Sequence, residues 1–429
     1  MKKISPLFAL ILSVFILSIP LAASGQDATH ISFGKLKIIP GVEGQVVYDD
    51  NIYMKNGKDD VANKKVSDTI FHVKPGLLLT YDLPERGSLK LGWSGDWAFY
   101  NNQVANNWNN QSVIAGIDYA PPQGLILGVN NEWRFAQDPY GGPNQYGIGR
   151  TTSRWMDTLG VKVGNTWGAS FRTILLYDLY TQQYTSKYDY SQNYTTNKMG
   201  LSVEGLFLPK TWGFMSYSYG MQQFGSFNGE VIDGVFFPGV ADNRKADNKF
   251  HQINGGLKWD PGSKLSGALS FGYQFLNYDN NLDGSGNSRS NVDTWIAATN
   301  INFAATEKTN LSLNITRAVQ NQGSNSNIYF MDTSIGISVQ QKFLAKFAAN
   351  AGFTFSMNDY NTVPTGVTRV AVPVDKREDR NYIFNVGLDY MIREWITFGI
   401  AYKYNQKTSN YSDFEFTDNQ YLASLKIVY

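Results

Sequence analysis

The stretch Leu265-Ser-Gly-Ala-Leu-Ser-Phe-Gly-Tyr-Gln-Phe-Leu-Asn277 decides the fold class. Its odd positions are mostly apolar or aromatic, and its even positions are mostly small or polar. Successive side chains of a β-strand point to opposite faces, so this pattern predicts a strand with one apolar and one polar face. The same alternation recurs at Leu89–Phe99, Lys346–Ser356 and Asn381–Tyr390. The chain is therefore predicted to be all-β.

Composition indicates that the apolar faces contact lipid. Aromatic residues make up 14% of the chain, there are 40 glycines and no cysteine, and mean hydropathy is −0.30. Beyond the N-terminus no run of about 18 apolar residues remains, which excludes helical spans. Outer-membrane β-barrels place apolar residues outward, with aromatic girdles at both interfaces. The balance of 37 basic and 36 acidic residues argues against a nucleic-acid partner.

The connections between strands also alternate in length. Short segments with turn chemistry, such as Pro84–Gly87, alternate with longer polar stretches, such as Asp50–Asp68. Eight short turns and nine longer loops predict a transmembrane antiparallel up-and-down β-barrel of about 18 strands. Merging one weak hairpin gives 16 strands as the alternative. Short turns are expected on the periplasmic side together with both termini.

The N-terminus has the order of a secretory signal peptide. Lys2 and Lys3 precede an apolar run from about Leu7 to Leu21, followed by small residues. Cleavage is expected after Gly25, with cleavage after Ser24 as the alternative. We therefore predict a signal peptide at residues 1–25, a short periplasmic segment at residues 26–35 and an outer-membrane barrel at residues 36–429. The expected location is the outer membrane of a Gram-negative bacterium.

The last nine residues carry a separate signal. They alternate up to a terminal aromatic residue, with apolar side chains at Tyr421, Ala423, Leu425, Ile427 and Tyr429. This pattern resembles the C-terminal signal by which the barrel-assembly machinery recognises outer-membrane barrels. We expect this strand to close the barrel against the first strand, about Leu36–Tyr48. The expected partners thus include outer-membrane lipid and the assembly machinery.

The first strand resembles a known family. The run from Pro40 to Tyr53, which contains Tyr48-Asp-Asp-Asn51, is followed by Ser67-Asp68 and by Pro75-Gly76-Leu77. These features are similar to the opening of the putative β-barrel porin 2 family. The resemblance covers about the first 60 mature residues. It implies an outer-membrane barrel, and because several members are tied to exopolysaccharide secretion, it also implies a role in that process.

Charged residues fall mostly on the predicted polar face. We expect the following residues to line the lumen: Lys74, Asp82, Lys90, Asp96, Asp118, Glu132, Arg134, Lys162, Arg172, Asp178, Lys198, Glu204, Lys258, Lys346, Asp389 and Lys403. The basic members slightly outnumber the acidic ones, which would favour anionic sugars. The alternative is that these charges simply solvate the lumen, and that interpretation is preferred.

Three functions are compatible with these patterns. The leading hypothesis is a passive conduit for exopolysaccharide or capsule secretion, with a polysaccharide substrate and separate periplasmic polysaccharide-export proteins as partners. A general diffusion or saccharide-uptake porin is the second, and a surface adhesin or receptor is the third. The loop Ser226–Ala246 is a candidate plug, because its apolar residues are unusual for an exposed loop: Phe227, Val235, Phe236 and Phe237.

Catalytic and metal sites are not expected. The three histidines, His30, His72 and His251, form no predicted set with a serine and an acid, so we expect neither an enzyme nor a cofactor. A loop with Asp279, Asn281 and Asp283 has the first half of a calcium-loop spacing. Its twelfth position is Ser290 instead of glutamate, so a polar surface loop is the preferred interpretation.

Overall fold

The structure is a computed structural model. It describes residues 30–57, 64–84, 87–138, 152–168, 170–225, 230–232, 235–237, 246–259, 264–282, 286, 288–321, 329–361 and 376–429. The predicted signal peptide, residues 1–25, lies outside these ranges. Within them, no helix has the length and apolar character needed to cross a membrane.

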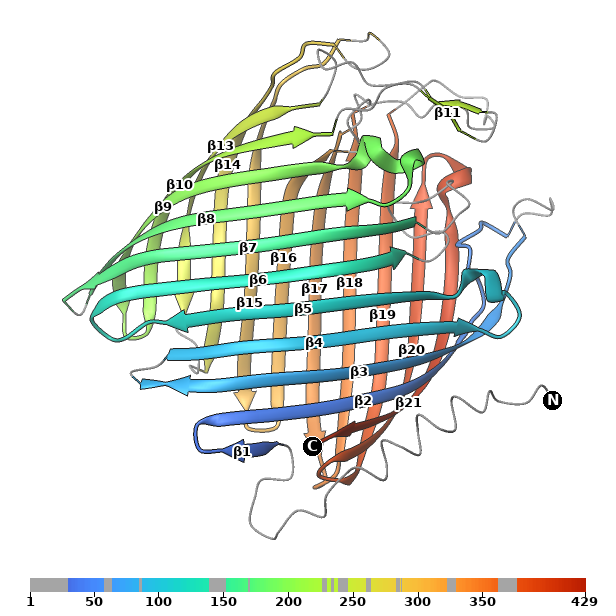
Figure 1. Ribbon diagram of the computed structural model, residues 1–429, viewed down its shortest axis with the longest axis horizontal. Coiled ribbons are helices and arrows are strands. Elements are labelled where there is room, and N and C mark those ends of the chain that lie inside the picture. The colour runs from blue at the N-terminus through green and yellow to red at the C-terminus, as the bar shows by residue number, and fades with distance from the viewer. Residues whose placement is uncertain are drawn as a thin grey trace.

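Within the described residues, nineteen strands form one antiparallel sheet, and eighteen of them close into a barrel (Figure 1). The barrel strands are β2 Leu36–Asp49, β3 Asp68–Leu83, β4 Gly87–Tyr100, β5 Trp108–Tyr119, β6 Gly124–Asp138, β7 Thr152–Trp167, β8 Phe171–Tyr184, β9 Tyr194–Leu208, β10 Thr211–Phe224, β13 Asn248–Trp259, β14 Leu265–Tyr278, β15 Val292–Thr306, β16 Thr309–Asn321, β17 Tyr329–Phe343, β18 Phe347–Tyr360, β19 Glu378–Arg393, β20 Ile396–Ser409 and β21 Phe416–Val428. The predicted barrel and its strand number are thereby confirmed, and the alternative of 16 strands is not observed.

The barrel closes where the sequence predicted. The last strand, β21, pairs with the first barrel strand, β2, from Gly41↔Val428 to Asp49↔Gln420. The backbone N–H of Tyr429 adds a hydrogen bond to the carbonyl of Pro40 at 3.0 Å. Closure removes both free edges of the sheet, so each barrel strand has a neighbour on both sides.

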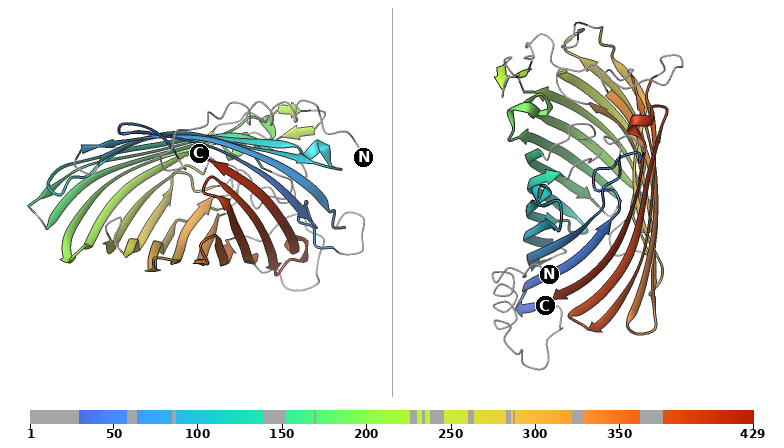
Figure 2. Two further views of the ribbon diagram at one scale, coloured as in Figure 1. Left: turned by 90° about the horizontal axis from the view of Figure 1, so that it is seen from below. Right: turned by 90° about the vertical axis from the view of Figure 1, so that its right-hand side faces the viewer.

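The two ends of the barrel differ. Eight short turns lie at one end, which we call the turn end, and β1 (Ile31–Phe33) and the C-terminus lie there too (Figures 1 and 2). Nine longer connections lie at the other end, the loop end. They include the 3-10 helices η2 (Val104–Asn106), η3 (Lys187–Gln192) and η5 (Ser412–Phe414), and a hairpin of β11 (Glu230–Ile232) and β12 (Val235–Phe237). This asymmetry matches the prediction.

The segment before the barrel contains a strand that the sequence did not indicate. β1 folds back on β2 through a tight turn at Gly34, whose φ of 63° is tolerated best by glycine. It pairs Ile31↔Ile38 and Phe33↔Leu36. β2 begins before its pairing with β21 starts at Gly41. β1 thus covers the part of β2 that extends past the last strand, where backbone groups would otherwise be unpaired.

The pairing register divides the strand residues between two faces. Lys162 on β7 contacts Asp118 on β5, and Arg172 on β8 stacks over Trp212 on β10, so these side chains reach past an intervening strand. Long side chains two strands apart converge on the concave side of a curved sheet, which makes this the inner face. The opposite face carries exposed apolar side chains: Leu91, Trp93, Leu175, Leu201, Phe271, Ile337, Phe353, Val386 and Ile400.

Polar groups on the outer face gather near the loop end. Most charged outer-face residues of the barrel strands lie toward that end: Asp157, Lys249, Asp293, Arg317, Asp359, Glu378 and Arg380. Trp133 and Trp155 stack on the same side with centroids 4.4 Å apart. A membrane-spanning strand needs only about 9–11 residues, and β7 has 16. The strands therefore project beyond the hydrocarbon layer at the loop end.

Candidate functional site

The inner face of the barrel brings together the residues predicted to line the lumen. By register, the following lie on it: Lys74, Asp82, Lys90, Asp96, Asp118, Glu132, Arg134, Lys162, Arg172, Asp178, Lys198, Glu204, Lys258, Asp389 and Lys403. Lys346 differs, because it lies in the turn between β17 and β18. Its Nζ is 3.5 Å from the carbonyl of Ile392.

Strands β2–β9 and β19–β21 form what we call the charged wall. Several of its acids and bases lie close to one another and pair. Lys162 Nζ is 2.7 Å from Asp118 Oδ1, and Lys198 Nζ is 2.9 Å from Asp178 Oδ2. On β6, Arg134 Nε lies 3.0 Å from Glu132 Oε1. Each pair offsets its own charge, so the wall is hydrated without strong local fields of one sign.

The first strands of the charged wall follow the same pattern. His72 Nδ1 lies 2.8 Å from Asp96 Oδ1. Lys74 Nζ donates to Gln45 Oε1 at 2.7 Å and is 3.9 Å from Glu43 Oε1. His72 is therefore a lumen residue whose ring contacts an acid. Paired charges of this kind support the interpretation that the charged residues solvate the lumen.

Glu204 lies on the inner face near the turn end and is almost completely buried. It is 2% exposed, and Lys258 Nζ contacts its Oε1. Arg172 Nη1 is 4.0 Å from Oε2, and the Arg172 guanidinium lies 3.6 Å above the ring of Trp212. One carboxylate thus serves two cations. The ring holds the arginine by a cation–π contact, which is strongest when both partners are desolvated.

Strands β10 and β13–β18 form a different inner surface, which we call the neutral wall. Amides and hydroxyls meet there: Gln252 Nε2 donates to Gln274 Oε1 at 3.1 Å, and Ser312 Oγ donates to Asn302 Oδ1 at 2.7 Å. Asn300 Nδ2 also donates to Asn314 Oδ1. The lumen is therefore polar all round, but its two sides differ in chemistry.

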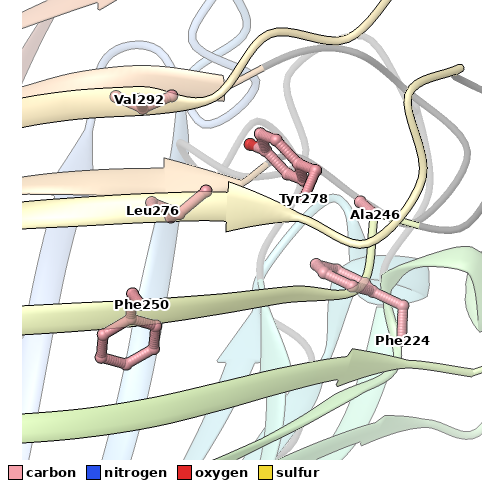
Figure 3. Packing of buried hydrophobic residues seen from close by; sticks show 6 residues of the cluster. All are labelled: Phe224, Ala246, Phe250, Leu276, Tyr278 and Val292. Atoms are coloured by element: carbon pink, nitrogen blue, oxygen red, sulfur yellow. The ribbon is translucent and has the colours of Figure 1, made fainter.

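The predicted plug loop lies partly outside the described residues. Phe227 is not described, whereas Val235, Phe236 and Phe237 form β12, which pairs with β11 from Ile232↔Val235 to Glu230↔Phe237. Phe224, just before the loop, and Ala246, its last residue, join a buried cluster at the loop end (Figure 3). The other members are Phe250, Leu276, Tyr278 and Val292. Phe250, Leu276 and Val292 come from the inner face of the neutral wall. An apolar surface inside the mouth is therefore covered within the chain itself.

A second apolar cluster narrows the opposite side of the mouth. Ile52, just after β2, is 5% exposed and packs with the inner-face side chains Val47, Ile70 and Tyr100. Asn106 of η2 donates to the hydroxyl of Tyr53 at 3.0 Å. The sequence reasoning did not identify this inward fold. The available signal was an isoleucine between polar residues at the start of a polar loop.

Asn51 anchors that fold. It is fully buried, its Nδ2 donates to the carbonyls of Lys55 (2.7 Å) and Thr417 (2.8 Å), and its Oδ1 accepts from the N–H of Lys55 (2.9 Å). Asp50 accepts from the N–H and Nδ2 of Asn419 at 2.8 and 2.7 Å. The Asp-Asp-Asn motif thus ties the first strand to the last, and it does not simply begin a solvated loop.

Two acidic groupings bear on metal binding. Carboxylate oxygens of Asp49, Asp50 and Asp418 lie within 4.8 Å of one another where β2 meets β21. Amide groups of Asn419 and Gln420 donate to them. In the calcium-like loop, Asp279 Oδ1 accepts from Lys249 Nζ at 3.0 Å. Asn281 is exposed, and Asp283 lies outside the described residues.

The C-terminal signal residues are divided between β21 and the chain end. Tyr421 and Leu425 point outward and are 56% and 45% exposed. Tyr421 pairs with Tyr48 across the seam, with ring centroids 6.4 Å apart. Ile427 also lies on the outward side by register. The signal therefore presents an apolar stripe on the outside of the closing strand.

Comparison with known proteins points to one family. The model of the family described as Putative beta-barrel porin 2 matches residues 25–429. No curated protein matches the chain.

Similar solved structures include OmpT of Vibrio cholerae (11% identity, TM-score 0.36, covering 93% of this chain and 100% of that chain). They also include the siderophore receptor PirA of Pseudomonas aeruginosa (9%, 0.39, 91% and 80%) and the outer membrane protein opdK of the same organism (9%, 0.40, 91% and 99%). These TM-scores are too low to bear on function, which is therefore inferred from the family match.

Proposed function

Because the chain belongs to the Putative beta-barrel porin 2 family, and is therefore an integral outer-membrane barrel of the porin type, we propose that it is a passive conduit for exopolysaccharide or capsule secretion. The cell is a Gram-negative bacterium. The chain performs no catalytic step, and no cofactor is needed. The polymer enters at the turn end and leaves at the loop end.

The pairing of charges in the lumen is the observation that carries this proposal. A conduit for a long polymer must be hydrated and must not hold the polymer tightly. A barrel of this strand number is wide enough to leave an aqueous channel. Cations such as Lys162 and Lys198 are already engaged by Asp118 and Asp178, so they offer little additional attraction to a passing chain.

The turn end supplies the docking surface for other proteins. Its connections are short, such as the two residues between β9 and β10, so they hold their residues close to the strand ends, where a partner can contact them. Periplasmic polysaccharide-export proteins are the proposed partners at this end. At the membrane, lipid contacts the outer face, and the barrel-assembly machinery recognises the stripe of Tyr421 and Leu425.

A deletion with a chemically blockable lumen tests the proposal. The gene is deleted and complemented with the wild-type chain or with Ala298→Cys, an exposed position on the inner face. Because the sequence contains no cysteine, a bulky maleimide reacts only with the variant. We expect deletion to abolish surface polysaccharide, the untreated variant to restore it, and the reagent to stop secretion by the variant alone. Undiminished polysaccharide in the deletion strain overturns the proposal.

A general diffusion or saccharide-uptake porin is the second candidate. The inward fold around Ile52 and η2 favours it, because a narrowed mouth suits small solutes better than a long polymer. Liposomes that contain the purified chain swell in small sugars if this function is correct. Absence of sugar flux from the same preparation that conducts ions counts against it.

A further inference from the structure

The central part of the neutral wall carries no charged side chain among the described inner-face residues. Among the described inner-face residues of β10 and β13–β18, acidic or basic side chains occur only near strand ends: Lys258 and Lys342 at the turn end, and Asp332 at the loop end. The charged wall, in contrast, carries acids and bases along much of its height, such as Asp96 and Lys162. The lumen therefore has one uncharged side.

Side-chain amides and hydroxyls replace the charges on this side. On β16 they occupy successive inward positions, at Asn310, Ser312, Asn314 and Thr316. Asn310, Asn314 and Thr316 are exposed, and so are Asn300 and Asn302 on the neighbouring strand β15. Every second residue of a strand faces the same way, so the polar groups form a row along the channel axis.

These groups are also linked to one another. Asn302 Nδ2 donates to Asn300 Oδ1 at 3.3 Å, and Ser312 Oγ donates to Asn302 Oδ1. Asn300 Nδ2 contacts Asn314 Oδ1. An amide has two donors and two acceptor lone pairs, so each keeps capacity for a further partner after these bonds. The row is thus held in place and can still exchange hydrogen bonds with a solute.

We propose that the neutral wall is the track along which the polymer moves, and that the polymer is an uncharged glycan. This inference rests on the proposed secretion function. Hydroxyls of an uncharged sugar exchange water for amides and hydroxyls with little net change in free energy, so the polymer touches the wall without being trapped. A carboxylate or sulfate on each repeat would lose water against the central part of this wall, where the described inner-face residues include no cation.

The paired cations of the charged wall offer little to an acidic polymer. Lys162 and Lys198 already have carboxylate partners, so an incoming acid must displace Asp118 or Asp178 to reach them. The displaced carboxylate then repels the polymer. An uncharged glycan meets no such competition on either side of the lumen, which is why neutral sugar polymers fit this channel best.

Current block in planar bilayers tests the inference with the full-length chain. Maltoheptaose, an uncharged oligomer, is compared with a galacturonate heptamer at equal concentration and at both polarities of low voltage. We expect short current interruptions with maltoheptaose, at least about fivefold more frequent than with the acidic oligomer. More frequent block by the galacturonate heptamer overturns the inference.

Matched variants locate the track. Asn300→Ala with Asn314→Ala removes two amides from the neutral wall, and we expect about fivefold fewer interruptions by maltoheptaose. Asp178→Asn with Lys198→Gln removes one pair from the charged wall without changing net charge, and we expect wild-type block. Ion conductance verifies that each variant is folded. Equal effects of the two double variants place the contact elsewhere and overturn the assignment of the track.

The outcome separates this inference from the function on which it rests. If deletion abolishes secretion and the acidic oligomer blocks best, the conduit stands and the uncharged substrate is wrong. A secreted polymer rich in uronic acid or sulfate leads to the same conclusion. If maltoheptaose blocks at the neutral wall but deletion leaves surface polysaccharide intact, the wall contacts uncharged sugars and the secretion role is wrong.

Discussion

Asn51 and Thr417 lie 366 positions apart in the chain and are joined by a hydrogen bond of 2.8 Å, from Asn51 Nδ2 to the Thr417 carbonyl. Asn51 follows the first barrel strand, and Thr417 belongs to the last. The bond therefore spans the seam of the barrel at the loop end. Asn51 is completely buried. A replacement that cannot form hydrogen bonds therefore leaves the backbone groups bonded to Asn51 unpaired, and no water can take its place.

Asn51→Leu tests the seam. The change keeps the number and branching of the side-chain heavy atoms and removes three side-chain hydrogen bonds. One net bond is worth about 1 kcal/mol, with a further cost for each buried group left unpaired. We expect the free energy of unfolding to fall by about 2–4 kcal/mol. The urea midpoint of the purified barrel, read by tryptophan fluorescence, measures the loss. Asn310→Leu, at an exposed inner position, is the control, and equal midpoints for the two variants would reject the seam role.

Leu175 and Leu176 test the assignment of the two faces. They are neighbours on β8, but Leu175 is 61% exposed on the outer face, whereas Leu176 faces inward. A lysine near the membrane midplane costs about 2–4 kcal/mol on the lipid side and little in a hydrated lumen. We expect Leu175→Lys to reduce the folded fraction in lipid vesicles, measured by heat-modified gel mobility, and Leu176→Lys to leave it nearly unchanged. The reverse order would mean that the faces are exchanged.

Much of the barrel could be predicted from the sequence, because its signals are local. Alternation depends only on neighbouring residues, so strand number and the closure of β21 on β2 were correctly predicted. β1 was not predicted, since three residues are too short for periodicity to be recognised. Its tight turn with Gly34 is the only local cue.

The contacts inside the lumen depend on information that periodicity lacks. The sequence shows which face of a strand is polar. It does not show the register, which decides which residues of neighbouring strands lie side by side. Lys162 and Asp118 come from strands that are not even adjacent, and their contact needs both the stagger and the curvature of the sheet. The burial of Asn51 was missed for a similar reason, because its partner Thr417 lies at the other end of the chain.

Glu204→Gln tests the role of the paired charges in ion selectivity. The change removes the carboxylate that serves Lys258 and Arg172, so two cations face the channel near the turn end without their acid. We expect the reversal potential in a potassium chloride gradient to shift toward chloride. The barrel also loses about 1–3 kcal/mol of stability, because hydrogen bonds to a buried charge are lost.

Asp82→Asn is the control for Glu204→Gln. Asp82 pairs with Lys37 at 3.0 Å, but its side chain is 56% exposed, so water already screens the charge. We expect a smaller shift in reversal potential from this variant. A shift as large as that of Glu204→Gln would mean that the selectivity follows total charge and not the buried acid.

The buried cluster at the mouth leads to a prediction about conductance. Phe224 lies just before the candidate plug loop, and Ala246 is the last residue of that loop. Both are buried, at 3% and 2% exposed, among apolar side chains of the inner wall. Burial of an inward apolar surface requires that chain atoms cover it, and those atoms occupy cross-section that ions could use. Replacing residues 227–244 by a short glycine linker should therefore raise single-channel conductance about twofold, in line with control of flux by pore constriction. Shortening another long loop, by removing residues 364–373, is the control for loop length alone. Unchanged conductance after the first deletion, or an equal rise after the second, would reject the plug.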